Sequence, residues 1–286
     1  MEILLKNDNC SANLISKGAE LKSLTVCGRE LMWRADPAFW GKTSPILFPM
    51  IGTLKGGKTL INGAEYRITK HGFVRDLELT PETMTGTSAL FSLMQSDYTK
   101  TMFPFDFRFT VQYTLKTDGI TVTYRVKNNS DEKMPFCIGA HPAFACDGYL
   151  SDYRLEFQKI ENAAVPNYNI DTGLHEEHNR REILMDDNIV HLNSEMFYTD
   201  VCYFDKLRSR SVMLLSKDNK GVRVDFPDFT SLGVWQAKDA PFLCIEPWCG
   251  SADFDDCTGV FAEKRGIVIL DTGEEKAFTY SITAIG

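Results

Sequence analysis

The stretch Cys137–Phe144, CIGAHPAF, places one of the chain's five histidines directly before a proline. The proline favours an extended backbone at His141, and the small residues Gly139 and Ala140 leave room for a ligand to approach. Phe144 offers an apolar face nearby. Because an imidazole titrates near neutral pH, His141 could both donate and accept a proton. The alternative is a hydrogen-bonded histidine of the core.

A carboxylate ends the apolar run Phe242–Trp248, FLCIEPW, again just before a proline. Charged residues are seldom buried without a partner or a function. Glu246 is therefore either a structural anchor bonded to the backbone or a base whose pKa is adjusted by partial burial. Trp248 beside it offers a surface on which a ligand could stack.

The stretch Lys70–Asp76, KHGFVRD, alternates chemically useful side chains. In an extended segment His71, Phe73 and Arg75 point the same way and would line a wall with two donors and one aromatic face. The simpler interpretation is a loop with an exposed ion pair between Arg75 and Asp76, since most such pairs are incidental.

Two aspartates occur in Asp225–Phe229, DFPDF, and a tryptophan ends the nearby LGVW at Trp235. Asp228 follows a proline in a predicted turn, where it could accept hydrogen bonds from hydroxyl groups. Aspartates in turns more often bond their own backbone, so that alternative stays open.

The elements that must position these side chains are strands. Phe107–Leu115 and Ile120–Val126 alternate between apolar and polar residues, which predicts a hairpin with one face on a core. Its turn is Lys116–Gly119, with glycine where a positive φ costs little. Further strands are predicted at Ala89–Met94, Tyr153–Phe157, Val212–Leu215, Gly221–Phe226 and Phe278–Ala284, and Ile267–Leu270 is predicted to be a strand buried on both faces.

Signals for helices are few, and Glu176–Asp187 could hold one or two helical turns. Strands and helices do not alternate as they would in a parallel α/β fold, and no glycine-rich phosphate-binding motif occurs. Many antiparallel strands without a linker predict an all-β fold with few short helices, a single large antiparallel β-sandwich over residues 1–286. Two such sheets can curve to leave a groove for an extended polar ligand such as a sugar.

Composition excludes several classes of partner. The net charge is −8 and the pI about 5.2, so neither nucleic acid nor an anionic membrane surface is an expected partner. No apolar run is long enough to span a membrane, and the N-terminus lacks the features of a secretory signal. The eight cysteines contain no C-x-x-C pair and are expected to be reduced thiols of a cytoplasmic protein. We expect no metal site.

Five stretches, taken in order, resemble the aldose 1-epimerase (galactose mutarotase) family, and within it the LacX-like bacterial branch. They are LFPMIG (Leu47–Gly52), HGFVRD (His71–Asp76), GAHPAF (Gly139–Phe144), DFPDF with LGVW (Asp225–Trp235) and CIEPW (Cys244–Trp248). The resemblance covers nearly the whole chain. It implies the large β-sandwich often called a supersandwich, and interconversion of the α and β anomers of a free aldose without any cofactor.

The resemblance also implies roles for individual residues. His141 corresponds to the general acid and Glu246 to the general base, while His71 contacts the sugar with the help of Arg75. The expected hydroxyl-binding aspartate is Asp228, with Asp225 as the alternative. The aromatic residues expected to stack on the apolar face of the pyranose are Phe73, Phe144, Trp235 and Trp248.

This pair of groups suits the reaction, because an anomer changes only when its ring opens. A carboxylate can take the proton of the C1 hydroxyl while an imidazolium delivers one to the ring oxygen. Rotation about C1–C2 and closure with the roles reversed then give the other anomer. Each positioned group contributes on the order of 10²–10⁴-fold.

Two departures from the family pattern leave the sugar open. Thr53 stands where many LacX-like relatives carry arginine, and Trp248 stands where galactose-specific members carry glutamine.

The alternative functions are a hexose-6-phosphate 1-epimerase, which needs convergent cations, and a sugar-binding protein without catalysis. A glycoside hydrolase would need two carboxylates across one bond. Both a monomer and a homodimer are compatible with the sequence.

Overall fold

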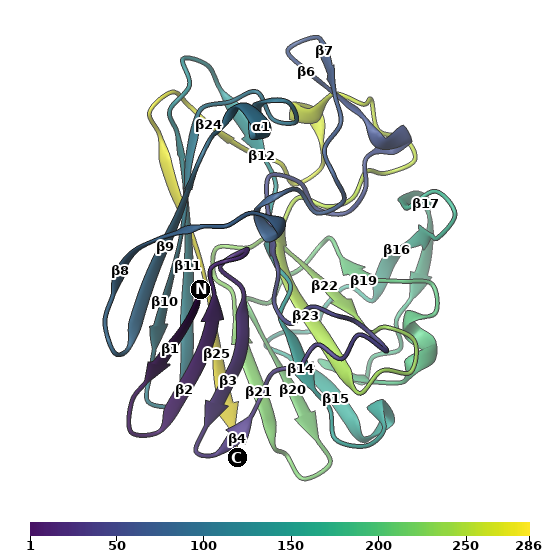
Figure 1. Cartoon of the computed structure of the whole chain (residues 1–286). Coiled ribbons are helices and arrows are strands. Elements are labelled where there is room, and N and C mark those ends of the chain that lie inside the picture. The colour runs from purple at the N-terminus through teal and green to yellow at the C-terminus, as the bar shows by residue number, and fades with distance from the viewer.

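The computed structural model describes all residues 1–286, and antiparallel strands dominate it (Figure 1). The strands of the first half are β1 (Glu2–Lys6), β2 (Cys10–Ile15), β3 (Leu21–Val26), β4 (Arg29–Glu30), β5 (Ile46–Leu47), β6 (Thr59–Ile61), β7 (Ala64–Tyr66), β8 (Thr80–Met84), β9 (Ser88–Met94), β10 (Phe107–Leu115), β11 (Gly119–Asn128), β12 (Met134–Phe136), β13 (Ile138–Ala140) and β14 (Ala143–Ala145).

The second half adds eleven more strands and completes the set of short helices. The strands are β15 (Tyr153–Phe157), β16 (Ala164–Asn169), β17 (Leu174–Glu182), β18 (Ile189–His191), β19 (Cys202–Phe204), β20 (Ser211–Ser216), β21 (Gly221–Asp225), β22 (Ser231–Trp235), β23 (Phe242–Cys249), β24 (Val268–Leu270) and β25 (Glu275–Ile285). The helices are α1 (Asp97–Lys100) and the 3₁₀ turns η1 (Lys55–Gly57), η2 (Val74–Asp76), η3 (Leu150–Asp152), η4 (Ser194–Phe197) and η5 (Phe261–Glu263).

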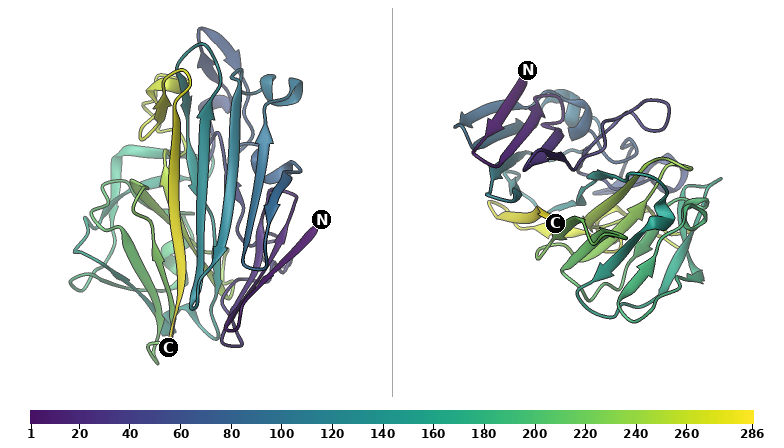
Figure 2. Two further views of the ribbon diagram at one scale, coloured as in Figure 1. Left: turned by 90° about the vertical axis from the view of Figure 1, so that its left-hand side faces the viewer. Right: turned by 90° about the horizontal axis from the view of Figure 1, so that it is seen from below.

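The largest sheet has nine strands in the order β18-β15-β20-β21-β25-β11-β10-β9-β8. Its centre contains the predicted hairpin, in which β10 pairs with β11 from Phe107↔Asn128 to Leu115↔Ile120. Figure 2 shows the C-terminal strand β25 in the middle of this sheet, between β21 and β11. The C-terminal strand therefore lies at the centre of this sheet, whereas the N-terminal strands β1–β4 form a sheet of their own.

A second sheet carries most of the candidate chemistry. Its order is β19-β22-β23-β13-β5, and β14 also pairs with β23. Every residue of β23 is buried. A continuous core of 66 residues joins this sheet to the nine-stranded one, and at its centre the ring of Phe48 lies 5.3 Å from that of Phe109 and 5.6 Å from that of Phe136. The predicted all-β antiparallel sandwich is thus confirmed.

Smaller sheets surround these two layers. The four-stranded sheet β1-β2-β3-β4 has β2 against β10 and β3 against β11. The two-stranded ribbons are β6-β7, β12-β24 and β16-β17. No helix is long and apolar enough to cross a membrane, and all eight cysteines are free thiols.

Three local predictions are wrong. The segment Glu176–Asp187 contains no helix, because most of it belongs to β17, whose backbone partners in β16 lie outside the local window. Within Ile267–Leu270 only β24 is a strand, and Ile269 is 46% exposed. Gly119 does not have a positive φ. Glycine is needed there because a Cβ would lie 1.9 Å from the carbonyl oxygen of Ile282 in β25.

Candidate active site

His141 and Glu246 are brought together by strand register. Gly139 of β13 pairs with Trp248, and Ala143 of β14 pairs with Cys244, in one continuous register with β23. His141 therefore lies opposite Glu246 where the prolines that follow His141 and Glu246 interrupt the ladder. Residues directly opposite each other in an antiparallel pair point to the same face of the sheet. We call these two residues the acid–base pair.

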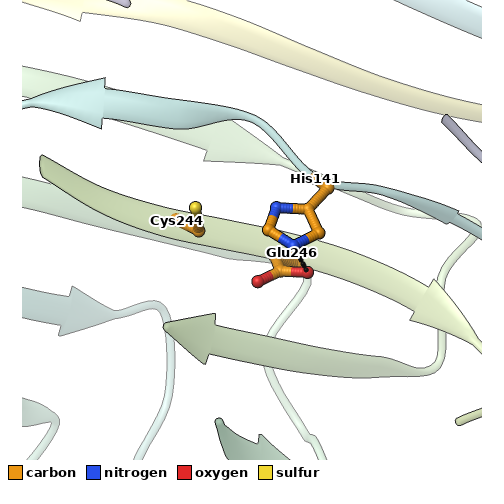
Figure 3. Close-up of side chains that lie close together, drawn as sticks. All are labelled: His141, Cys244 and Glu246. Carbon is orange, nitrogen blue, oxygen red and sulfur yellow. Dashed lines mark ion pairs between the residues drawn. The ribbon is translucent and has the colours of Figure 1, made fainter. Parts of the chain in front are cut away.

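The acid–base pair is in direct contact and almost completely buried. The Nε2 of His141 lies 3.2 Å from the Oε2 of Glu246, as Figure 3 shows, although the two groups are not aligned as a hydrogen bond. Burial, and then Arg75, lower the pKa of His141 to about 3. Burial, and then Asp200, raise the pKa of Glu246 well above its usual range. Because both shifts disfavour the charged form, His141 and Glu246 share one titratable proton over a wide pH range, and that proton is on Glu246.

The motif around His71 is held against LFPMIG by its backbone. Gly72 has a φ of 74°, and a Cβ there would lie 2.0 Å from the carbonyl oxygen of Phe48. The N–H of His71 donates to the carbonyl of Gly52 at 3.0 Å, and the N–H of Gly52 donates to the Nδ1 of His71 at 3.2 Å. Since Nδ1 is the acceptor, the proton of a neutral His71 is on Nε2. Burial, and then His141, lower the pKa of His71 well below its usual value.

The predicted alternation of His71, Phe73 and Arg75 on one wall is wrong for its middle member. His71 has a φ of 66° and η2 follows it, so the segment is not extended. Phe73 is 2% exposed and packs in the core. His71 and Arg75 do line one cavity, and Arg75 also forms a 3.7 Å ion pair with Asp76.

That cavity has a volume of about 270 Å³, at the small end for sites that hold organic ligands. Five of its polar or aromatic residues were not singled out by the sequence analysis: Trp40, Lys70, Tyr168, His175 and Asp200. They come from loops and from the ribbon β16-β17. Burial raises the pKa of Asp200, and Lys70 opposes that shift. The remaining lining residues are Gly52, His71, Arg75, His141, Val201, Trp235, Glu246, Trp248 and Ala252.

Trp235 and Trp248 line the cavity as the sequence suggested. Trp248 is 4% exposed and is seated between two glycines, because a Cβ on Gly139 or Gly233 would lie 2.6 Å or 2.8 Å from its ring. The space that Gly139 leaves is thus filled by Trp248 and not by a ligand. Ala140 is likewise buried, paired with Ile46.

Phe144, Asp225 and Asp228 lie outside the cavity, so we do not retain them as ligand-binding candidates. Phe144 is 1% exposed and belongs to the main core. Asp225 forms an ion pair with Arg223 at 2.6 Å. Asp228 accepts a hydrogen bond of 2.9 Å from the N–H of Thr279 in β25, so it bonds the backbone of a distant strand and not that of its own turn.

Three donor atoms of the site could together approach a soft divalent ion. One ligand atom each from His141, Cys244 and Glu246 lies within 4.8 Å of the others, and all three residues are buried. Cys244 and Glu246 are two residues apart in β23 and therefore share a face (Figure 3). Zinc binds thiolate and carboxylate anions, whereas burial raises the pKa of both Cys244 and Glu246 and keeps them protonated, so we assign no metal to this cluster.

Comparisons with known proteins agree over the whole chain. A family model described as aldose 1-epimerase matches residues 1–283. The plasmid and chromosomal forms of protein LacX from Lactococcus lactis subsp. lactis are each 34% identical to this chain over 301 residues, covering 100% of both sequences.

Solved structures give the same picture. A galactose mutarotase related enzyme from Lactobacillus acidophilus is 29% identical, with a TM-score of 0.93, covering 99% of this chain and 97% of that one. A galactose mutarotase-like protein from Lactobacillus casei is 26% identical, also with a TM-score of 0.93, covering 99% and 100%.

Proposed function

Because the chain belongs to the aldose 1-epimerase family, we propose that it interconverts the α and β anomers of a free aldohexose. His141 acts as the general acid and Glu246 as the general base. The observation that carries this proposal is the buried contact of 3.2 Å between these two groups in a cavity of about 270 Å³. That volume favours a single sugar ring over an oligosaccharide.

In the proposed reaction the sugar separates the two members of the acid–base pair. Its C1 hydroxyl approaches the carboxylate of Glu246, and its ring oxygen approaches Nε2 of His141. The reacting form has an ionised Glu246 and a protonated His141, which differs from the neutral pair by one proton moved across the contact. Proton transfer at both oxygens opens the ring, and reversal of the two roles closes it on the other face of C1.

Other lining residues are suited to bind the hydroxyl groups that do not react. The Nε2–H of His71 can donate, because its Nδ1 is occupied by the N–H of Gly52. Asp200, at the cavity wall, can accept. Trp235 and Trp248 offer apolar surface to the carbon face of the ring.

A second candidate is anomer exchange of an anionic aldose such as a hexose 6-phosphate. It is favoured by Lys70, an exposed cation that lines the cavity with no ion pair, on the same loop as Arg75. Arginine and lysine are the side chains that most often bind phosphate. We rank it second because Asp200 and Glu246 line the same cavity and offset these two charges.

Polarimetry on freshly dissolved α-D-glucose and α-D-galactose tests the proposal. The wild type should speed mutarotation over buffer, whereas His141→Asn and Glu246→Gln should each lose on the order of 10²–10⁴-fold of the acceleration. Asp225→Asn, which changes a half-buried acid outside the cavity, is the matched control and should keep full activity.

Each contrary outcome points to a different function. A wild type that matches buffer on both neutral sugars but accelerates anomer exchange of glucose 6-phosphate would support the anionic substrate. Tight sugar binding by calorimetry without any acceleration would support a binding protein. Activity that survives both substitutions would disprove the roles given to the acid–base pair.

A further inference from the structure

No hydrogen bond to another residue orients the ring of His141. Its Nδ1 is buried and has no hydrogen-bond partner. A histidine used for proton transfer is commonly oriented by a hydrogen bond from its second nitrogen to a carboxylate or a carbonyl. Since Nε2 faces Glu246, some other contact must hold the imidazole plane in this protein.

Aromatic rings supply that contact on three sides of His141. Trp40 stacks on its face, with ring centroids 4.8 Å apart and planes inclined by 26°. Trp235 meets it edge-on at 5.9 Å and 81°, and His71 meets it edge-on at 5.7 Å and 79°. Of these three rings Trp40 is the one that stacks parallel on the imidazole, and its distance is within the range of a cation–π contact.

Trp40 is itself held firmly, although no strand contains it. Its carbonyl accepts a hydrogen bond of 2.9 Å from the indole N–H of Trp33, and its N–H donates to the carbonyl of Asp36 at 2.9 Å. The indole also packs edge-on against Trp235, with centroids 5.5 Å apart. The face towards His141 is therefore fixed before any ligand arrives.

We propose that Trp40 is a positioning residue that fixes the plane of the His141 imidazole and stabilises its protonated form. The inference rests on the proposed function, because only an acid at this position needs to be protonated and aimed. The negative face of the indole attracts an imidazolium and is indifferent to a neutral imidazole. Trp40 thereby shifts the acid–base pair from its neutral form towards the ionic form that reacts.

The titratable and charged groups around His141 act on it in different directions. Glu246 and Cys244 face it from β23, and in the neutral pair burial keeps the proton on both of them by raising their pKa values. Arg75 and Lys70 oppose a positive charge on it and lower its pKa. Once the proton has moved, the carboxylate of Glu246 at 3.2 Å attracts the imidazolium, and the indole face of Trp40 adds a second attraction.

Trp40→Phe and Trp40→Leu test the inference, since phenylalanine keeps a π face and leucine keeps only apolar volume. We expect Trp40→Leu to lower kcat roughly five- to thirty-fold, the equivalent of a cation–π contact of about 1–2 kcal/mol. The acidic limb of its kcat/KM profile should move about one pH unit lower. Trp40→Phe should stay within about threefold of the wild type. The control is Phe39→Leu, an exposed ring of the same loop that packs on Trp33, and it should match the wild type.

The pH profile separates charge stabilisation from packing. A lower kcat in Trp40→Leu with an unmoved acidic limb would overturn the inference, because misplacement alone does not change the protonation of His141. If the wild type accelerates no sugar, the proposed function fails, and ring ¹⁵N shifts of His141 then decide the inference without substrate. A lower protonation midpoint in Trp40→Leu than in Trp40→Phe would support it, and equal midpoints would refute it.

Discussion

Replacing His175 by phenylalanine should remove a pH-dependent cost of folding. The imidazole is 0% exposed, and neither ring nitrogen has a hydrogen-bond partner. It stacks on Tyr203, with centroids 4.7 Å apart and planes inclined by 24°, and Phe254 lies 5.1 Å away. A phenyl ring can occupy this aromatic box without any polar atom to satisfy.

The magnitude follows from the shift in pKa. Burial, and then Lys264 and Arg180, lower the pKa of His175 from 6.5 to about 3. Between these two values the unfolded chain binds a proton that the folded chain does not, so stability falls as the pH falls below 6.5. Each pH unit costs about 1.4 kcal/mol, which gives about 2 kcal/mol at about pH 5. In His175→Phe that loss is absent.

Urea denaturation at about pH 7 and about pH 5 gives the loss of unfolding free energy between the two pH values for each protein, and the effect is the difference between the loss in the wild type and the loss in His175→Phe. The wild type should lose about 2 kcal/mol more than His175→Phe between the two conditions. His71 and His141 are present in both proteins, so their contributions cancel. His178→Phe, at an exposed position of the same strand, controls for the substitution itself. Equal pH dependence in the wild type and His175→Phe would refute the reasoning, because His175 would then be protonated without penalty in the folded state.

Two further predictions concern the site. The profile of kcat/KM against pH should be bell-shaped. Its acidic limb should fall near the lowered pKa of His141, about 3, and its basic limb should fall above the raised pKa of Glu246. A profile with a single limb would contradict a proton shared by the two groups. Gly72→Ala should cost at least about 2 kcal/mol and most activity, measured by denaturation and polarimetry, because its Cβ would meet Phe48. Gly63→Ala, with a φ of 80° and open space around it, should cost only about 1–2 kcal/mol.

The sequence predicted the sandwich because alternation is a local signal. The residues of β10 and β11 reveal their buried face without knowledge of any partner strand. The same alternation of faces would also have shown that Phe144 does not point into the site. Positions 141 and 143 share a face in an extended segment and 144 points away, so Phe144 packs with the core while Ala143 lies opposite Cys244.

Other site residues could not be found from local patterns, because loops and distant strand pairings place them. Asp200 has a φ of 74° in the loop before β19, and Trp40 lies in a loop between β4 and β5. Neither position is marked by periodicity. Lys70 was within reach of the analysis, since it directly precedes His71, but its exposure at the cavity depends on the turn that the N–H of Gly72 closes on the carbonyl of Thr69. The opposition of His141 and Glu246 likewise depends on a register that spans more than a hundred residues.

Unsatisfied polar groups are concentrated where the ligand is proposed to bind. Twelve buried side-chain nitrogen and oxygen atoms lack a hydrogen-bond partner, and six of them belong to Arg75, His141, His175, Glu246 and Trp248, which all line the cavity. Each such atom costs about 1–3 kcal/mol of desolvation, and a purely structural cavity would have little reason to gather them. A ligand rich in hydroxyl groups can both donate to and accept from such atoms, whereas an apolar ligand would leave them unpaired. Burial also favours the neutral forms of two of these residues, His141 and Glu246. The cavity thus favours a neutral polyol over an anion at its inner end, and only the mouth, at Lys70, is suited to a negative group.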